Sequence, residues 1–147
     1  MDIKNYTKET FKLLDKVNSL LLREFESILQ YELTPKQSML IQFVHIAKTI
    51  TVNELALQMN TTASAVSQLL NKLEKEDYIK REINPENRRE ILISLGLNGL
   101  KLYEEYDKID QRVIDKYFSK LTTDEMVQFR AVIEKLHTII TDENDKG

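Results

Sequence analysis

The residue types best suited to contact nucleic acid lie together in the segment 62–75, TASAVSQLLNKLEK. Wound as a helix, this segment places aliphatic side chains three and four residues apart on one stripe, namely Val66, Leu69, Leu70 and Leu73. The opposite side carries short hydroxyl, amide and ammonium groups, namely Ser64, Ser67, Gln68, Asn71, Lys72 and Lys75. Such groups hydrogen-bond to base edges and pair with phosphates. The segment therefore predicts a helix that contacts DNA.

This polar surface is also free of acids. No Asp or Glu occurs between Glu54 and Glu74, although 24 of the 147 residues are acidic. One exposed face is thus kept without negative charge. An ordinary amphipathic helix with a polar outside is the alternative, and the neighbouring elements decide between the two.

Composition limits the classes of function. The chain has 41% hydrophobic and 31% charged residues, with three Gly and two Pro, which is typical of one helix-rich soluble domain. It has no cysteine, which excludes disulfides, thiolate metal sites and cysteine nucleophiles. The N-terminal stretch is charged and no apolar run reaches about 18 residues, so we expect a cytoplasmic protein without a membrane span.

The charge distribution is uneven. The net charge is −3, but residues 34–89 contain eight Lys or Arg and six Asp or Glu, a balance of +2, so the remainder carries −5. A mildly basic middle between acidic flanks is compatible with DNA binding, but it is too weak a signal to argue for it alone.

Capping signals predict where the helices around this segment begin. A broad apolar face predicts one long helix over residues 5–31. Thr34 with Gln37 and Thr51 with Glu54 have the spacing of capping boxes, which predict a central core helix over 34–47 that is apolar nearly all round, and a short helix after Thr51. Asn60 suits a left-handed turn before Thr62. Two helices joined by so short a turn predict a helix-turn-helix.

The pattern after residue 75 changes to β-strand periodicity. Runs 78–83 and 90–95 alternate or are β-branched, and the polar loop 84–89 between them ends in Arg88 and Arg89. A hairpin directly after a helix-turn-helix makes a winged helix. Its arginines could reach phosphates or a narrow minor groove while the segment 64–71 enters the major groove.

Long helices are expected on both sides of this winged helix. Helical periodicity returns over 98–117, and a third capping box at Thr122 and Glu125 predicts a last helix to about residue 141. We expect its apolar side chains to face inward, namely Met126, Phe129, Val132, Ile133, Leu136, Ile139 and Ile140. The flanking helices predict a homodimer, whose twofold axis would present two recognition helices to a pseudo-palindromic site.

The ordered set of these segments resembles the multiple antibiotic resistance regulator (MarR) family of winged helix-turn-helix transcription factors. The resemblance rests on 33–37 (LTPKQ), 51–56 (TVNELA), 62–67 (TASAVS), 73–79 (LEKEDYI) and the wing 84–89 (NPENRR) leading into 92–95 (LISL). It covers essentially the whole chain. It implies a single domain over residues 1–147, with a winged DNA-binding lobe at 33–95 and dimerisation helices at 1–32 and 96–147.

The resemblance also implies a function and its contacts. A member of this family is expected to be a sequence-specific regulator, usually a repressor, that binds double-stranded DNA as a homodimer and releases it when a small ligand binds. The family's wing arginine falls on Arg89, expected in the minor groove, beside Arg88. The recognition-helix contacts fall on Thr62, Ser64, Ser67, Gln68 and Asn71, with Lys72 on the same face.

Two positions depart from the family pattern. The family usually has Asp two residues before the wing arginine and pairs the two in a salt bridge, but here that position is Asn87, so only a hydrogen bond could replace the pair. Gly96 stands where the family favours Thr as the cap of the next helix. We therefore expect the start of that helix to be less firmly set.

By family analogy, a pocket for an aromatic or lipophilic effector would lie between the winged lobe and the dimer helices. The candidate lining residues are Phe25, Phe43, Tyr103 and Tyr106, although plain core packing explains each aromatic side chain taken singly. The two histidines, His45 and His137, lie in apolar helical contexts that favour a structural role, so we expect no metal, no cofactor and no enzyme. The remaining alternative to a DNA-binding regulator is a winged-helix module that binds protein without specific DNA binding.

Overall fold

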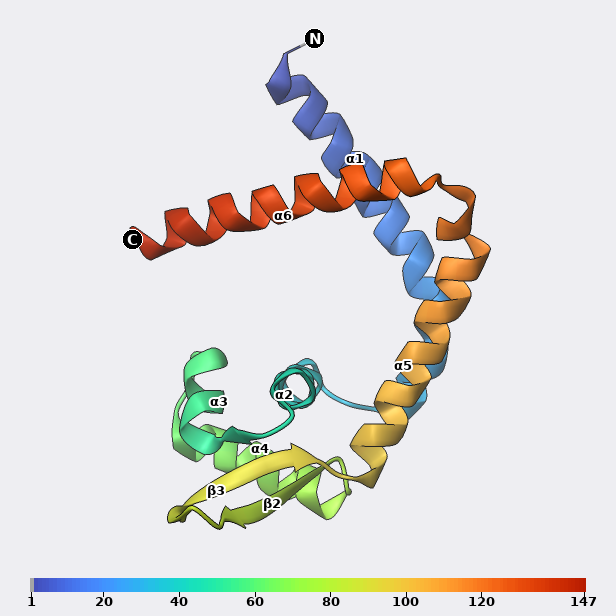
Figure 1. Ribbon diagram of the computed structural model, residues 1–147. Coiled ribbons are helices and arrows are strands. Elements are labelled where there is room, and N and C mark those ends of the chain that lie inside the picture. Colours follow the sequence, from blue (N-terminus) through green and yellow to red (C-terminus); the bar gives the residue numbers. More distant parts are fainter. Residues whose placement is uncertain (1) are drawn as a thin grey trace. The chain divides into compact units, whose positions relative to one another are not determined.

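The computed structural model describes residues 2–147, whose elements follow the expected order (Figure 1). The α-helices are α1 (Ile3–Leu22), α2 (Pro35–Ala47), α3 (Val52–Gln58), α4 (Ala63–Lys75), α5 (Leu97–Lys116) and α6 (Thr123–Asp145). Two 3-10 segments are η1 (Arg23–Tyr31) and η2 (Phe118–Lys120), and the strands are β1 (Ile50–Thr51), β2 (Ile79–Asn84) and β3 (Asn87–Leu95). The predicted fold, mainly helical with a wing and long terminal helices, is confirmed.

The chain divides into two compact units, one ending at Ile109 and one running from Asp110 to Gly147. The first contains the complete winged helix, and the second contains the end of α5, η2 and α6. The assignment of residues 33–95, here called the winged lobe, to DNA binding stays a prediction. Among residues 2–147, no helix combines the length and apolarity needed to span a membrane.

The winged lobe is built on a three-stranded antiparallel sheet in the order β1-β3-β2. Figure 1 shows β2 and β3 as one long hairpin, and α4 packs against β2. Aliphatic side chains from α2, α3, α4 and the sheet are fully or almost fully buried together, namely Leu40, Ile41, Val44, Ile50, Leu55, Val66, Leu70, Leu73, Ile79 and Ile93. This core fixes α4 by its apolar stripe and leaves the other side of the helix exposed.

The predicted capping boxes all form. The hydroxyls of Thr34, Thr51 and Thr122 each accept a hydrogen bond from the backbone N–H three residues later. The side-chain oxygens of Gln37 and Glu54 in turn accept hydrogen bonds from the backbone N–H groups of Thr34 and Thr51, at 2.9 and 3.4 Å. The starts of α2, α3 and α6 are therefore set by local hydrogen bonds that the sequence predicted.

The expectation of one α-helix over residues 5–31 was wrong in its second part. The α-helix ends at Leu22, and η1 continues with three residues per turn. Phe25, Ile28 and Tyr31 follow one another at intervals of three, and all three are half-buried. A 3-10 segment places these three side chains on one face, whereas an α-helix would rotate them apart. Ile28 and Tyr31 pack on the core of the winged lobe.

The wing is longer than predicted, and its loop is shorter. Asn87, Arg88 and Arg89 belong to β3, and the turn is reduced to Pro85 and Glu86. The Asn84 side chain accepts a hydrogen bond from the Glu86 N–H at 3.0 Å, and Asn84 pairs with Asn87 across the turn. This turn, stabilised by a side chain, lets strand pairing continue where the polar sequence predicted a loop. The sequence also gave no sign of β1, which is only two residues long.

Two predicted burial patterns were wrong. Helix α2 is not a core helix on all sides, because Met39 and Ile46 are exposed while Leu40, Ile41 and Val44 are buried. Along α6 no side chain is buried within the chain. Met126 is half-buried and the other apolar side chains expected inward are exposed. An apolar stripe identifies a face that avoids water, but it does not specify a partner within the same chain.

The start of α5 was expected to be weakly defined because Gly96 stands at its cap position. Backbone and side-chain hydrogen bonds instead hold this start in place. Gly96 donates its N–H to the Tyr78 carbonyl at 3.0 Å, and Asn98 bonds the carbonyls of Asp77 and Glu76 through its backbone and side-chain nitrogens. A Cβ at position 96 would lie 2.4 Å from the Asp77 oxygen. Glycine is therefore required here because two backbone segments approach closely.

Candidate nucleic-acid interface

The turn before α4 fixes where this helix starts. Asn60 adopts the left-handed conformation, with a φ of 53°, and Thr61 donates its N–H to the Ala56 carbonyl at 2.9 Å. Thr62 then caps the helix, its hydroxyl oxygen accepting from the Ala65 N–H at 3.1 Å. The oxygen of Thr62 is thus engaged in the cap, and its O–H hydrogen remains the group with which it could contact a phosphate.

The polar residues predicted for contact share one side of α4. Ser64, Gln68, Asn71 and Lys72 are exposed and Ser67 is half-buried, while Val66, Leu70 and Leu73 lie buried behind them. Amide and hydroxyl groups at these intervals present a row of donors and acceptors of the kind that bases and phosphates recognise. The structure brings these residues together on an exposed helix face, and their contact with DNA stays a prediction.

The single acid of α4 is neutralised from the wing. Glu74 pairs with Arg81 of β2, whose Nε and Nη2 donate to the two carboxylate oxygens at 3.1 and 3.0 Å. The hydrogen bonds from Arg81 lower the pKa of Glu74, and the same pairing raises the pKa of Arg81. The carboxylate of Glu74 is therefore compensated by the guanidinium of Arg81.

The two wing arginines do not act as one pair. Consecutive strand residues point to opposite faces, so Arg88 and Arg89, both exposed, project to different sides of the hairpin. Arg89 lines a hollow of about 280 Å³ together with Asn53 and Asn87. Asn87 accepts a hydrogen bond from the backbone N–H of Arg89 at 3.3 Å. Where the family usually has a salt bridge between an Asp and the wing arginine, Asn87 therefore bonds the backbone N–H of Arg89.

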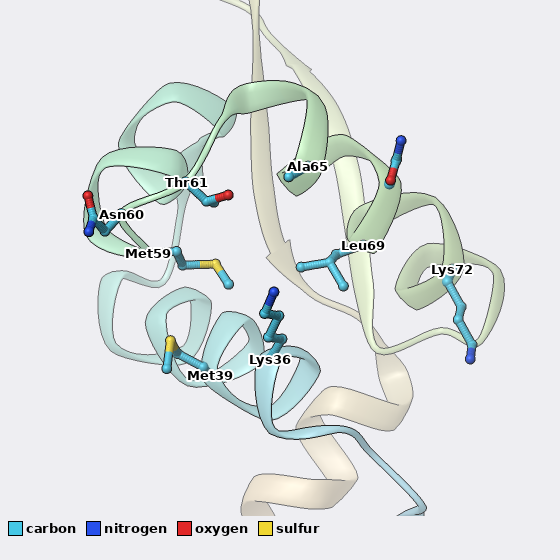
Figure 2. A pocket seen from close by; sticks show the side chains of 9 residues that line it. Lys36, Met39, Met59, Asn60, Thr61, Ala65, Leu69 and Lys72 are labelled. Atoms are coloured by element: carbon cyan, nitrogen blue, oxygen red, sulfur yellow. The ribbon is translucent and has the colours of Figure 1, made fainter.

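A second hollow, of about 490 Å³, lies beside α4 (Figure 2). Figure 2 shows the Lys36 side chain reaching from α2 into the space between Met59 and Leu69, whereas Lys72 points away from it. Gln68 is also part of its lining. Lys36 places a cation at the start of α2, near the polar face of α4, and the sequence analysis did not single it out.

Three of the four candidate effector-binding aromatics come together. The ring centroids of Phe25 and Tyr106 are 6.1 Å apart and those of Tyr103 and Tyr106 are 5.3 Å apart. Phe43, Tyr103 and Tyr106 all pack against the core of the winged lobe. Burial raises the pKa of Tyr103 to about 12 and also raises that of Tyr106. These contacts are those of aromatic packing, and a role in ligand binding stays a prediction.

The two histidines, for which a structural role was expected, both lie at exposed positions. His45 is exposed and stacks on Tyr103, with ring centroids 3.7 Å apart, and His137 is exposed on α6. Over residues 2–147, no group of three or more His, Asp or Glu side chains is placed to hold a metal ion.

Arg81 is a second functional candidate, besides Lys36, that the sequence analysis missed. Besides Glu74, it contacts Asn71, donating from Nη2 to Oδ1 at 2.9 Å. Asn71 and Glu74 are three residues apart on α4, which places them on one face. An arginine on a wing strand could have been suggested as their partner only if the strand register had been known.

Comparison with known proteins identifies the family. The model of the MarR family matches residues 31–90. The transcriptional repressor MdtR of Bacillus subtilis is 31% identical over 111 residues, which cover 76% of this chain and 72% of MdtR. The chain belongs to the MarR family. It is therefore a member of a family of winged helix-turn-helix transcriptional regulators.

Solved MarR-type structures share the fold. FabT of Streptococcus pneumoniae, solved in complex with DNA, matches with a TM-score of 0.72 at 18% identity, covering 93% of this chain and 98% of FabT. MepR of S. aureus, solved with bound ethidium bromide, matches with a TM-score of 0.70 at 23% identity, covering 88% of this chain and 94% of MepR. At these identities the likeness shows the fold alone.

Proposed function

We propose that this MarR-family protein is a cytoplasmic transcriptional repressor without catalytic activity of its own, which binds a pseudo-palindromic DNA site as a homodimer and responds to a small aromatic or lipophilic effector. One observation carries the DNA-binding part of the proposal. It is the exposed face of α4, which presents hydroxyl, amide and ammonium groups. The only acid of this helix, Glu74, is paired with Arg81, and the adjacent wing carries two further arginines. The FabT complex with DNA and the name of MdtR as a repressor support this assignment.

Within the proposal, the two parts of the surface have different roles. Gln68 and Asn71 contact base edges in the major groove, with Ser64 and Ser67 beside them. Thr62 and Lys72 contact phosphates, and Arg88 and Arg89 contact the backbone and minor groove from the wing. Phosphate contacts set affinity and position, whereas amide contacts to bases select the sequence.

A salt titration tests DNA binding. The affinity of the whole chain for a duplex from its own upstream region is measured between low and moderate salt. Each neutralised phosphate contributes about 0.9 to the slope of log affinity against log salt, so two copies using Lys72, Arg88 and Arg89 give a steep negative slope. A slope near zero, or no binding at low salt, would contradict the proposal. That result would favour the alternative of a protein-binding module, with which the net charge of −3 agrees.

The homodimer is supported by the apolar faces of the terminal helices. No residue of α1 or α6 is buried, and large apolar side chains on both are exposed. Sedimentation of the purified chain is expected to give a dimer. Leu136→Lys, which places an ammonium group among the apolar side chains of α6, is expected to shift it toward monomer. A monomeric wild-type chain would contradict the proposed pairing.

The effector proposal rests on the aromatic group of Phe25, Tyr103 and Tyr106, and MepR bound to ethidium shows an aromatic ligand on this fold. Aromatic compounds that stabilise the wild-type chain against heat are expected to stabilise Tyr106→Ala less. Equal stabilisation of both proteins would place the effector elsewhere.

A further inference from the structure

Arg81 connects the wing to the recognition helix through two different side chains. Its guanidinium donates to both carboxylate oxygens of Glu74 and, through Nη2, to the amide oxygen of Asn71 at 2.9 Å. The Arg81 side chain is only 26% exposed, so its position is held by its surroundings as well as by these bonds. Asn71, by contrast, is exposed on the face of α4 proposed to meet DNA.

The chemistry of this contact fixes the orientation of the Asn71 amide. A guanidinium has donors and no acceptor, whereas an asparagine amide has an oxygen that accepts and a nitrogen that donates. The atom of Asn71 facing Arg81 must therefore be the oxygen, and the amide nitrogen points elsewhere. A hydrogen bond with a charged donor is also stronger than a neutral one, so rotation of the amide is disfavoured.

We propose that Arg81 is a positioning residue, which turns the Asn71 amide so that its nitrogen donates to a base acceptor in the major groove. This inference rests on the proposed function as a DNA-binding regulator, and it adds which chemical group of Asn71 faces the base. It also gives the wing a role in base selection, because the residue that orients Asn71 belongs to β2.

A base preference follows from this orientation. In the major groove, guanine presents O6 and N7, adenine presents N7 and thymine presents O4 as acceptors, whereas cytosine presents the N4 donor. An amide nitrogen held toward the groove is satisfied by the first three bases and opposed by cytosine. At the base contacted by Asn71, cytosine is therefore the most disfavoured base. An unrestrained amide could rotate and accept from cytosine N4, so the discrimination depends on Arg81.

A role confined to stability makes a different prediction. If Arg81 only joins the wing to α4 through Glu74, its loss lowers stability or weakens binding to every sequence equally. Positioning of Asn71 instead changes selectivity at a single base pair. Selectivity at one position is thus the measurement that separates the two roles.

The experiment is sequence selection from a random duplex library, followed by affinity measurements on singly substituted duplexes. Wild type is compared with three variants, namely Arg81→Lys, Asn71→Asp and Glu74→Gln, and with one control variant. Lys cannot bond Asn71 and Glu74 together as the arginine does. Asp keeps an acceptor for Arg81 but removes the donor that faces DNA. Gln at position 74 keeps an oxygen for Arg81 and leaves the Asn71 contact in place.

Lys80→Ala is the charge control, because it removes a cation from the opposite face of the same strand.

We expect the discrimination against cytosine at one base pair to fall by about fivefold or more in Arg81→Lys and Asn71→Asp, the loss typical of one base contact. We expect the other positions to keep their preferences, and the Glu74→Gln and Lys80→Ala profiles to match wild type. Asn71→Asp leaves Arg81 intact, so it tests the base contact of Asn71 even if Arg81→Lys is unstable.

An unchanged profile for Asn71→Asp, or a uniform loss at all positions for a folded Arg81→Lys, would overturn the positioning role while leaving DNA binding intact. A wild-type chain that enriches no sequence would overturn the proposed function and, with it, this inference.

Discussion

The winged lobe and the terminal helices have the same kind of amphipathic pattern, but they cover their apolar faces differently. In the winged lobe, Leu40, Leu55 and Leu70 are fully buried within one chain. In α1 and α6 no side chain is buried, and residues such as Phe11 and Leu136 are exposed. The winged lobe therefore buries its apolar faces within one chain, whereas the apolar faces of the terminal helices are left uncovered there, as our proposal of a homodimer requires.

Truncation of the lobe core should have the largest effect. Leu70→Ala removes a fully buried side chain, so it is expected to lower the free energy of unfolding by about 2–5 kcal/mol at any protein concentration. The matched change Leu136→Ala affects a side chain that is 46% exposed in the single chain. Its cost is expected to depend on protein concentration, as an interface requires. Denaturant unfolding at several concentrations measures both, and equal, concentration-independent losses would contradict the comparison.

A substitution at the close backbone contact of Gly96 comes next. In Gly96→Ala, the new Cβ would meet the Asp77 carbonyl oxygen at 2.4 Å, so the start of α5 or the turn after α4 must shift. The expected cost is about 1–3 kcal/mol, as for overpacking elsewhere. Gly147→Ala is the control, because its nearest contact would be an ordinary 3.6 Å. Equal thermal stability of the two variants would show that the contact is less close than described.

Helix caps allow a matched comparison of the two regions. Thr62→Ala removes the cap of α4 and Thr122→Ala removes the cap of α6, and each should cost about 1 kcal/mol of stability. Only Thr62→Ala is expected to weaken DNA binding in addition, because α4 carries the contact face. The DNA affinities of the two variants are compared under conditions in which the same fraction of each protein is folded. A comparable loss of affinity for Thr122→Ala would mean that the distinction between the regions fails.

The smallest effect concerns the ion pair between the wing and α4. Its hydrogen bonds with Arg81 lower the pKa of Glu74 below the usual 4.5. A lowered folded-state pKa contributes stability that is present above pH 4.5 and is lost as the pH falls through the lowered value. The stability difference between wild type and Glu74→Gln should therefore shrink on acidification below pH 4.5. When both proteins also carry Arg81→Gln, this stability difference should not change with pH. A pH dependence that persists with Arg81→Gln would have to come from another titrating group.

Most of the fold could be predicted from local chemistry. Threonine caps such as Thr34 and Thr51, and the left-handed turn at Asn60, act over three or four residues, so their spacing is visible in the sequence. The 3-10 geometry of η1 could not be predicted, because it depends on where Phe25, Ile28 and Tyr31 find partners. The strand β1 was too short to show a period.

The candidate site was predictable in part for the same reason. The polar face of α4 follows from helix periodicity, so Ser64, Gln68 and Asn71 could be selected from the sequence. The contact of Arg81 with Asn71 joins a strand to a helix ten residues away and depends on the register between them. Likewise, Arg88 and Arg89 project to opposite faces of the hairpin because β3 extends to the turn. The polar sequence at these positions had predicted a loop.

The most direct test compares Gln68→Ala with Arg89→Ala on a selected duplex and on a random duplex at the same salt concentration. The account predicts that Gln68→Ala weakens binding to the selected duplex by about 1–3 kcal/mol and leaves the random duplex nearly unaffected, because it removes a base contact. Arg89→Ala should weaken binding to both duplexes alike, because it removes a backbone contact from the wing. An equal loss on both duplexes for Gln68→Ala would contradict the assignment of α4 as the helix that selects the sequence.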